Sequence, residues 1–242
     1  MNILLLGYGK MGKTIEQIAK ERGHHIFAAI DLEQREEKLA ELDKSQVDVA
    51  IEFSSPEAAP ANIRYCIREG IPVISGTTGW LKEKPAIEDY CIEHNGTFFY
   101  ASNFSIGVNI FFRLNELLAE MMNRHQDYVP SLEEIHHTEK KDAPSGTAIT
   151  LAEGMLRHLS KLNDWHLQGR GVGDKTGSIP IVSKREGKVP GTHTVSYRSE
   201  IDEIEIRHTA HSRQGFALGA VLVAEWIKKK KGILQMEDFL KF

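Results

Sequence analysis

Two adjacent histidines, a lysine and a helix start lie within one short stretch of the chain. The stretch runs from Glu134 to Thr147 and reads EIHHTEKKDAPSGT. On a strand, neighbouring side chains point to opposite faces, so we expect His136 and His137 to have different roles. The Pro-Ser-Gly-Thr segment opens a predicted helix, whose first N–H groups have no partners inside the helix. Histidine, lysine and a helix N-terminus in one loop favour a proton donor beside a carboxylate-bearing substrate.

Two other interpretations of this stretch stay open. One is a metal site made of His136, His137 and a carboxylate. Adjacent histidines on a strand do not easily share one ion, however, and neither the H-x-H nor the H-E-x-x-H spacing occurs. The other is a polar surface loop that ends in an ordinary helix cap. We expect no metal.

A second group of residues has the spacing of a dinucleotide-binding loop. It follows a predicted strand, opens a helix and consists of Gly7, Tyr8, Gly9, Lys10, Met11 and Gly12. In such a loop one glycine makes a tight turn, one leaves space for a pyrophosphate and one lets helix and strand pack closely. Asp31 lies 19 residues beyond Gly12, where an acid accepts hydrogen bonds from the adenosine ribose. The alternative is a tight strand–helix turn with a capping aspartate.

The residues around Asp31 give mixed indications about the cofactor. Asp31 would repel the 2′-phosphate of NADPH and Leu32 adds no cation, which favours NADH. Lys10, Lys13 and Arg35 lie close enough in sequence to hold a phosphate instead. We expect NADH to be slightly favoured over NADPH.

Two more loops follow predicted strands. The candidate cofactor residues in them are Gly76, Thr77 and Thr78 after one strand, and Ala101, Ser102, Asn103 and Phe104 after the next. Ligands of open parallel sheets bind beyond the carboxyl ends of the strands, where small and hydroxyl residues leave room for a nicotinamide and its ribose. Ordinary turn chemistry explains either loop alone equally well.

The elements that must position these residues change in kind along the chain. Apolar runs predict buried strands at 3–6, 26–30, 47–53, 71–75 and 98–101, with helices between them, for example at 13–22 and 56–69. This alternation predicts an α/β fold with a parallel sheet covered by helices on both faces. Beyond residue 103, helices are expected at 110–122 and 147–162 and strands at 179–184, 192–198 and 201–208, an α+β pattern. The strand at 201–208 is expected to be half-buried, and a helix at 216–228 to return to the first sheet.

Composition limits the classes of function. The 242 residues include 30 Lys and Arg against 34 Asp and Glu, so a net charge of -4 indicates no nucleic-acid partner. The apolar runs fall far short of the roughly 18 residues of a membrane span, so we expect no membrane partner. Cys66 and Cys91 have no metal spacing and favour a reducing compartment. The chain opens into a strand-like run rather than a signal peptide, so we expect a cytoplasmic protein.

Taken together, the motifs resemble those of the dihydrodipicolinate (4-hydroxy-tetrahydrodipicolinate) reductase family. The matching segments read GYGKMG, EFSSP, GTTG, NFSIGVN, EIHHTEKKDAPSGTA, REGKVPGTH and HTAHSRQGFALGA. They occur in the order of the family and span nearly the whole chain.

The resemblance implies a domain plan and a reaction. A Rossmann-like dinucleotide-binding domain would occupy 1–103 and be completed by 215–242. A substrate-binding domain at 104–214 would build a homotetramer. The implied reaction is the NAD(P)H-dependent reduction of 4-hydroxy-tetrahydrodipicolinate, a small dicarboxylate, to tetrahydrodipicolinate in the diaminopimelate route of lysine biosynthesis.

The resemblance also implies roles for single residues. His136 resembles the acid/base residue, and Lys140 resembles the proton donor or carboxylate partner. His137, Gly146 and Thr147 would bind the substrate carboxylates. Spacing does not decide which of His136 and Lys140 delivers the proton. We assign the proton to His136 and expect Lys140 chiefly to hold charge.

The chain departs from the family pattern in its cofactor loops. The glycine loop is one residue shorter than in many members, and Leu32 stands where a basic residue often follows the ribose-binding acid. Both features bear on the cofactor preference rather than on the reaction. Two alternatives stay open: a nicotinamide-dependent dehydrogenase acting on another small carboxylate, and a non-catalytic NAD(H) sensor, which needs no proton donor.

Overall fold

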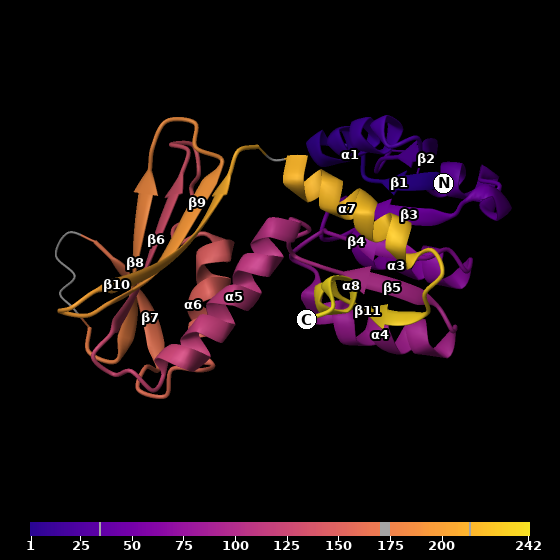
Figure 1. The fold of residues 1–242 in the computed structure, drawn as a ribbon. Helices are drawn as coiled ribbons and strands as arrows, with labels where there is room; N and C mark the ends of the chain where they lie inside the picture. Colours follow the sequence, from indigo (N-terminus) through magenta and orange to yellow (C-terminus); the bar gives the residue numbers. More distant parts are fainter. Residues whose placement is uncertain (34, 170–174, 213) are drawn as a thin grey trace. The chain divides into compact units, whose positions relative to one another are not determined.

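The chain folds into two compact units. The computed structural model describes residues 1–33, 35–169, 175–212 and 214–242. The first unit joins Met1–Ile106 to Gln214–Phe242, and the second is Gly107–Arg213. The chain therefore leaves the first unit, builds the second and returns to complete the first (Figure 1).

The first unit is built on a six-stranded parallel sheet in the order β11-β5-β4-β3-β1-β2. Its strands are β1 (Asn2–Leu6), β2 (His25–Ile30), β3 (Val49–Glu52), β4 (Val73–Ser75), β5 (Thr97–Tyr100) and β11 (Gly232–Leu234). Its helices are α1 (Lys10–Glu21), α2 (Arg35–Glu41), α3 (Ala59–Arg68), α4 (Lys84–Glu93), α7 (Gln214–Ile227) and α8 (Met236–Leu240). The predicted Rossmann-like α/β architecture is confirmed.

Alternation along the strands explains why both faces of this sheet are covered. In β1, Ile3 and Leu5 pack into a core with α1 and α7, whereas Leu4 and Leu6 pack into a second core with α3 and α4. Strands with apolar residues on both faces are stable only between two helical layers. The predicted return of the helix near residue 216 is confirmed, because α7 lies against the sheet (Figure 1). Its small and branched residues belong to the core that contains Ile3 and Leu5.

The second unit has a five-stranded mixed sheet in the order β10-β9-β6-β8-β7. Its strands are β6 (Val129–His136), β7 (Asp164–Gln168), β8 (Ser178–Arg185), β9 (Gly191–Arg198) and β10 (Glu203–Ala210). Strand β9 runs antiparallel to both β6 and β10, and β8 runs parallel to β6 and β7. Helices α5 (Ile106–Met122) and α6 (Gly146–Leu156) lie side by side against one face (Figure 1).

One sequence expectation in this unit was wrong in detail. The helix expected over 147–162 ends at Leu156, and the chain beyond it turns, with the N–H and Oγ of Ser160 bonded to Oδ1 of Asn123. The strand expected to be half-buried lies at the edge of the sheet. Ile204 faces the same side as the buried Tyr197. Ile204 is 39% exposed, whereas Ile206 packs against the core and His208 lies against Phe111 of α5. The strand is therefore half-buried, as expected.

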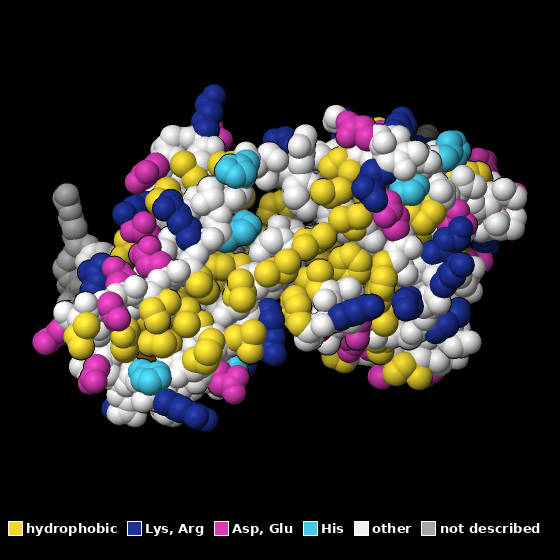
Figure 2. Space-filling model, viewed as in Figure 1, with side chains coloured by type: hydrophobic (Ala, Val, Ile, Leu, Met, Phe, Trp, Pro, Cys, Tyr) yellow, Lys and Arg dark blue, Asp and Glu magenta, His cyan; other side chains and the backbone are white. Residues whose placement is uncertain are grey.

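Helix α5 carries more apolar residues than its core can bury. Phe111 and Met122 pack against α6 and the sheet. The four that stay at least one-third exposed are Ile110, Leu114, Leu117 and Met121. Hydrophobic side chains gather over α5 on the face shown in Figure 2. Among the described residues, no helix is long and apolar enough to cross a membrane.

The close packing of α7 against the backbone of Phe104 can be tested by mutation. A Cβ atom at Gly219 would lie 1.8 Å from the carbonyl oxygen of Phe104, whereas at Gly215 the nearest atom would be 3.6 Å away. We expect Gly219→Ala to lower the free energy of unfolding by about 1–3 kcal/mol, because the packed backbone must shift. The matched Gly215→Ala should change it by much less. Urea titration followed by circular dichroism measures both, and equal effects would contradict this packing.

Candidate active site

The carboxyl ends of five parallel strands lie in register at one edge of the first sheet. The strand-end residues pair in the order Ile30, Leu6, Glu52, Ser75 and Tyr100. The chain passes from β2 on one side of β1 to β3 on the other, so the strand order reverses beside β1. Ligands of open α/β sheets bind at such a reversal. The structure therefore brings the predicted cofactor loops to one edge.

The three glycines of the first loop lie in different surroundings. Gly7 has a φ of +95°, and a Cβ there would meet the carbonyl oxygen of Phe53 at 2.1 Å. Gly12 lies in the first turn of α1, where a Cβ would lie 2.3 Å from the carbonyl oxygen of Gly7. Gly9 caps the helix, and apart from its chain neighbours no atom of the described residues lies within 4 Å of its Cβ position. Helix α1 thus begins at a residue without a side chain, Gly9, and the space beside that residue is open.

The side chains between these glycines lie in different surroundings. Tyr8 is half-buried and donates its hydroxyl hydrogen to Glu16. Met11 packs against the first core, and Lys10 is exposed in a first turn that has no acidic residue. A positive helix end without a competing carboxylate suits a phosphate group.

Asp31 lies directly after β2, as the ribose-binding assignment requires. It is exposed, and its Oδ1 accepts the N–H of Leu32 at 2.9 Å. The nearby Arg35 donates from Nε to Oδ1 of Asn62 at 2.5 Å. Arg35 is therefore held toward α3, with its side chain already engaged.

The remaining predicted cofactor residues divide into exposed and buried ones. Thr78 and Ser102 are exposed, while Gly76 and Asn103 are half-buried. Thr77, Ala101 and Phe104 are buried. The ring of Phe104 packs against Phe53 and Phe99 in the core, so only its backbone is placed to meet a ligand.

A buried glutamate that sequence reasoning missed joins two of these loops. Glu52 ends β3 and is fully buried. Its Oε1 accepts from the Ser54 N–H and Thr77 Oγ1, both at 3.0 Å, and its Oε2 accepts from Ser75 Oγ at 2.6 Å. A buried carboxylate needs such partners at every oxygen. Glu52 therefore fixes the loops after β3 and β4 relative to each other.

The histidine–lysine stretch forms a second cluster, in the second unit. His136 is the last residue of β6 and is buried, whereas His137 just beyond it is half-buried. Lys140 pairs through Nζ with both oxygens of Asp142, at 2.7 and 2.8 Å. Gly146 and Thr147 begin α6 behind the N-cap Ser145, whose side chain accepts the N–H of Ala148. Every substrate-site residue expected from the sequence thus lies at the end of β6, in the loop that follows it or in the first turn of α6.

Arg185 holds this loop against the sheet and was also missed. Its Nε donates to the carbonyl oxygen of Lys140 at 3.3 Å. Its Nη2 donates to the carbonyl oxygen of Asp142 at 2.5 Å and to Oε1 of Glu134 at 3.0 Å. Arg185 belongs to the REGKVPGTH segment, for which sequence reasoning named no role. The period of two along β6, which puts Glu134 and His136 on one face, is the signal that points to this cluster.

His193 completes the cluster on β9. Its ring lies edge-on to the ring of His136, with centroids 5.1 Å apart, and its Nε2 lies 3.1 Å from Ser145 Oγ. Burial, followed by the nearby His136, lowers the pKa of His193 to about 4. His193 is therefore uncharged at neutral pH.

Glu134, His136 and His193 are close enough together to be considered as metal ligands. However, Oε2 of Glu134 lies only 2.6 Å from Nδ1 of His136. Two ligands of one tetrahedral zinc ion, each about 2.0 Å from the metal, are separated by about 3.3 Å. Arg185 adds a positive charge to the same carboxylate. The geometry favours an ion pair over a metal centre.

Comparisons with known proteins agree over the whole chain. The sequence pattern of the N-terminal part of dihydrodipicolinate reductase matches residues 1–104, and that of its C-terminal part matches 107–240. The chain is 53% identical over 240 residues to 4-hydroxy-tetrahydrodipicolinate reductase of Christiangramia forsetii, which covers 99% of this chain and 98% of that protein. It is 37% identical to the Methanosarcina acetivorans enzyme of the same name, over 96% of this chain and 86% of that one.

Solved structures show the same fold. Dipicolinate-bound dihydrodipicolinate reductase from Paenisporosarcina sp. TG-14 superposes with a TM-score of 0.78 at 20% identity, over 99% of both chains. An amine dehydrogenase from Mycobacterium smegmatis gives 0.60 at 10% identity, over 97% of this chain and 94% of that one. Motifs, fold and sequence identity lead to one conclusion: the chain belongs to the dihydrodipicolinate reductase family of oxidoreductases.

Proposed function

We propose that the protein reduces 4-hydroxy-tetrahydrodipicolinate to tetrahydrodipicolinate with NAD(P)H, in the diaminopimelate route to lysine. One observation carries the proposal. In a member of this family, a histidine, a lysine and the N-terminus of α6 are gathered around a single loop. Dipicolinate, bound to the Paenisporosarcina relative, is likewise a small dicarboxylate. A cationic loop beside a helix N-terminus suits two carboxylates.

The cofactor belongs at the edge of the first sheet. The pyrophosphate would lie over Gly9 and the first turn of α1, and the adenosine ribose beside Asp31. The loops at 76–78 and 101–104 would face the nicotinamide end. Asp31 opposes a 2′-phosphate, whereas Lys10, Lys13 and Arg35 attract one. Because Arg35 is already bonded to Asn62, the balance keeps NADH slightly favoured.

The reaction needs a hydride and a proton and releases the 4-hydroxyl group as water, and the chain supplies the proton. NAD(P)H provides the hydride when it is bound. His136 is the acid, since an imidazole exchanges protons near neutral pH. Lys140 binds negatively charged groups. Its ammonium group pairs with the carboxylate of Asp142, and it would bind a substrate carboxylate in the same way. His137 and the N–H groups of Gly146 and Thr147 would hold the substrate from the other side.

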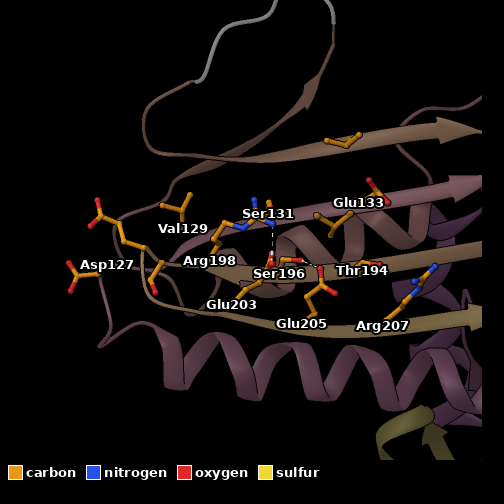
Figure 3. A pocket seen from close by; sticks show the side chains of 14 residues that line it. Asp127, Val129, Ser131, Glu133, Thr194, Ser196, Arg198, Glu203, Glu205 and Arg207 are labelled. Carbon is orange, nitrogen blue, oxygen red and sulfur yellow. Dashed lines mark hydrogen bonds and ion pairs between the residues drawn. The ribbon is translucent and has the colours of Figure 1, made fainter.

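The second unit offers a face for assembly into the homotetramer. The sheet face opposite α5 and α6 has a hollow of about 750 Å³, lined by polar side chains of β6, β9 and β10 (Figure 3). Ser131, Thr194 and Ser196 lie on this face, next to the charged Glu205 and Arg207 (Figure 3). Alternation along these strands makes one face core and leaves the other for a partner. A second copy of the chain is the proposed occupant.

The assigned acid gives the sharpest test of the reaction. We expect the wild-type protein to oxidise NADH and NADPH at 340 nm when the preceding synthase makes substrate in situ from pyruvate and aspartate semialdehyde. His136→Ala should lower kcat by roughly 10²–10⁴-fold and leave NADH binding unchanged in a fluorescence titration. The exposed His125→Ala is the matched control. NADH binding without synthase-dependent turnover in the wild type would favour the sensor or a relative with another substrate.

The glycine loop gives a test of cofactor placement. Gly9→Val should fold normally, because its Cβ meets open space, but should weaken NADH binding at least about tenfold by obstructing the pyrophosphate. Gly12→Val should instead lower the melting temperature, since its Cβ would lie 2.3 Å from a carbonyl oxygen. Unchanged NADH affinity in Gly9→Val would refute this placement of the loop.

Light scattering after gel filtration tests the assembly. We expect four times the chain mass of 27.3 kDa. Thr194→Arg, on the hollowed face, should reduce the measured mass by adding charge and bulk to the interface. Thr150→Arg, exposed on α6 on the other side of the sheet, should not. A monomeric wild type at micromolar concentration would overturn the proposed tetramer.

A further inference from the structure

Glu134 is a buried carboxylate for which the proposed mechanism has no use so far. It lies on β6 two residues before His136, so both side chains project from the same face of the strand. Its side chain is 0% exposed. A charge placed there must be compensated by close partners, because burial without them is very costly.

Each oxygen of Glu134 has a defined partner. Oε1 accepts from Nη2 of Arg185 at 3.0 Å and from the N–H of Ser145 at 3.2 Å. Oε2 lies 2.6 Å from Nδ1 of His136. Burial alone would raise the pKa of Glu134, but the contacts with His136, Ser145 and Arg185 outweigh it and hold the pKa well below its usual range. The carboxylate is therefore ionised and held on three sides.

The His136 ring is fixed on its other sides too. His193 meets it edge-on from β9. A Cβ at Gly191 would lie 3.0 Å from Nε2 of His136, so the absence of a side chain there keeps this edge of the ring clear. Among the described residues, Nδ1 of His136 forms no hydrogen bond of regular geometry, and its close polar contact is the ion pair with Oε2 of Glu134. In the described part of the chain, Glu134 is therefore the group placed to determine whether Nδ1 of His136 carries a hydrogen.

We propose that Glu134 is the positioning residue for His136: it keeps the hydrogen on Nδ1 and so presents Nε2 as the atom that delivers the proton. This inference rests on the proposed role of His136 as the acid. A carboxylate at Nδ1 fixes the tautomer of an imidazole and stabilises its charged form. Arg185 in turn fixes the carboxylate, and the same arginine holds the backbone of the Lys140 loop.

Several charged or titratable groups surround this ring. Glu134 faces it from β6, Arg185 from β8 and His193 from β9, while Lys140 and Asp142 lie in the following loop. His193 is uncharged at neutral pH, and Lys140 and Asp142 neutralise each other. The carboxylate of Glu134 is thus the charge in direct contact with the imidazole.

The first experiment compares Glu134→Gln with Glu116→Gln. Glu116 is also an arginine-paired carboxylate of the second unit, bound to Arg157 and Arg113, but outside this cluster. We expect Glu134→Gln to lower kcat by about 10- to 1000-fold, since an orienting carboxylate of this kind contributes up to about 10⁴-fold. KM for NADH should not change.

A double-mutant cycle separates positioning from a merely structural role. In the His136→Ala background, Glu134→Gln should change the residual kcat by less than about twofold, because the residue through which it acts is gone. If Glu134→Gln lowers kcat by the same factor in both backgrounds, the positioning role is refuted.

A measurement on the wild type covers the case in which the Glu134 variant does not fold. Long-range proton–nitrogen NMR spectra of protein labelled with ¹⁵N-histidine show which ring nitrogen carries a hydrogen. The signals of His136 are assigned as those that disappear in His136→Ala. We expect Nδ1 of His136 to be protonated across the active pH range, and an Nε2-only tautomer would overturn the inference. An inactive wild type would instead defeat the proposed function. An active wild type with Glu134→Gln equal to Glu116→Gln would defeat this inference alone.

Discussion

A buried carboxylate must be satisfied at every oxygen, and this requirement organises both units. In the first, Glu52 has only hydroxyl and N–H donors, so it acts as a fixed acceptor that joins two strand-end loops. In the second, Glu134 is paired with an arginine and a histidine, so it belongs to a network of ionisable side chains. Both glutamates lie at or near the carboxyl end of a strand, where the loops of a binding site begin. The two buried carboxylates therefore differ in their partners, which are uncharged donors in the first unit and charged side chains in the second.

The parallel sheet and its loops could be predicted because they follow from local rules. Runs such as 3–6 and 26–30 are apolar at every position, which is the pattern of a strand buried on both faces. Local rules also explain two glycines of the loop, since a Cβ at Gly7 or Gly12 would collide with backbone. Strand order and edge alignment then follow from connectivity.

The second cluster could be predicted only in part. His136 and Lys140 were identified by type and by resemblance, but Glu134, Arg185 and His193 come from three strands that meet only in the folded sheet. Parallel pairing of β6 with β8 joins segments about 50 residues apart, a distance over which no sequence period extends. The length of α6 was overestimated for a related reason. Leu159 lies in the turn after α6 but is still buried in the core. The apolar period therefore continues beyond the helix and does not show where the helix ends.

The return of α7 to the first sheet has a consequence for synthesis of the chain. When the first 106 residues have left the ribosome, the sheet face formed by Ile51, Ile74 and Phe99 still lacks α7, and β5 still lacks its neighbour β11. At roughly 5–20 residues per second, the rest of the chain takes several more seconds to appear. During that interval the nascent protein exposes an apolar face and an open strand edge. The synthesis of the first unit therefore begins first and ends last, and the second unit can fold before the first is complete.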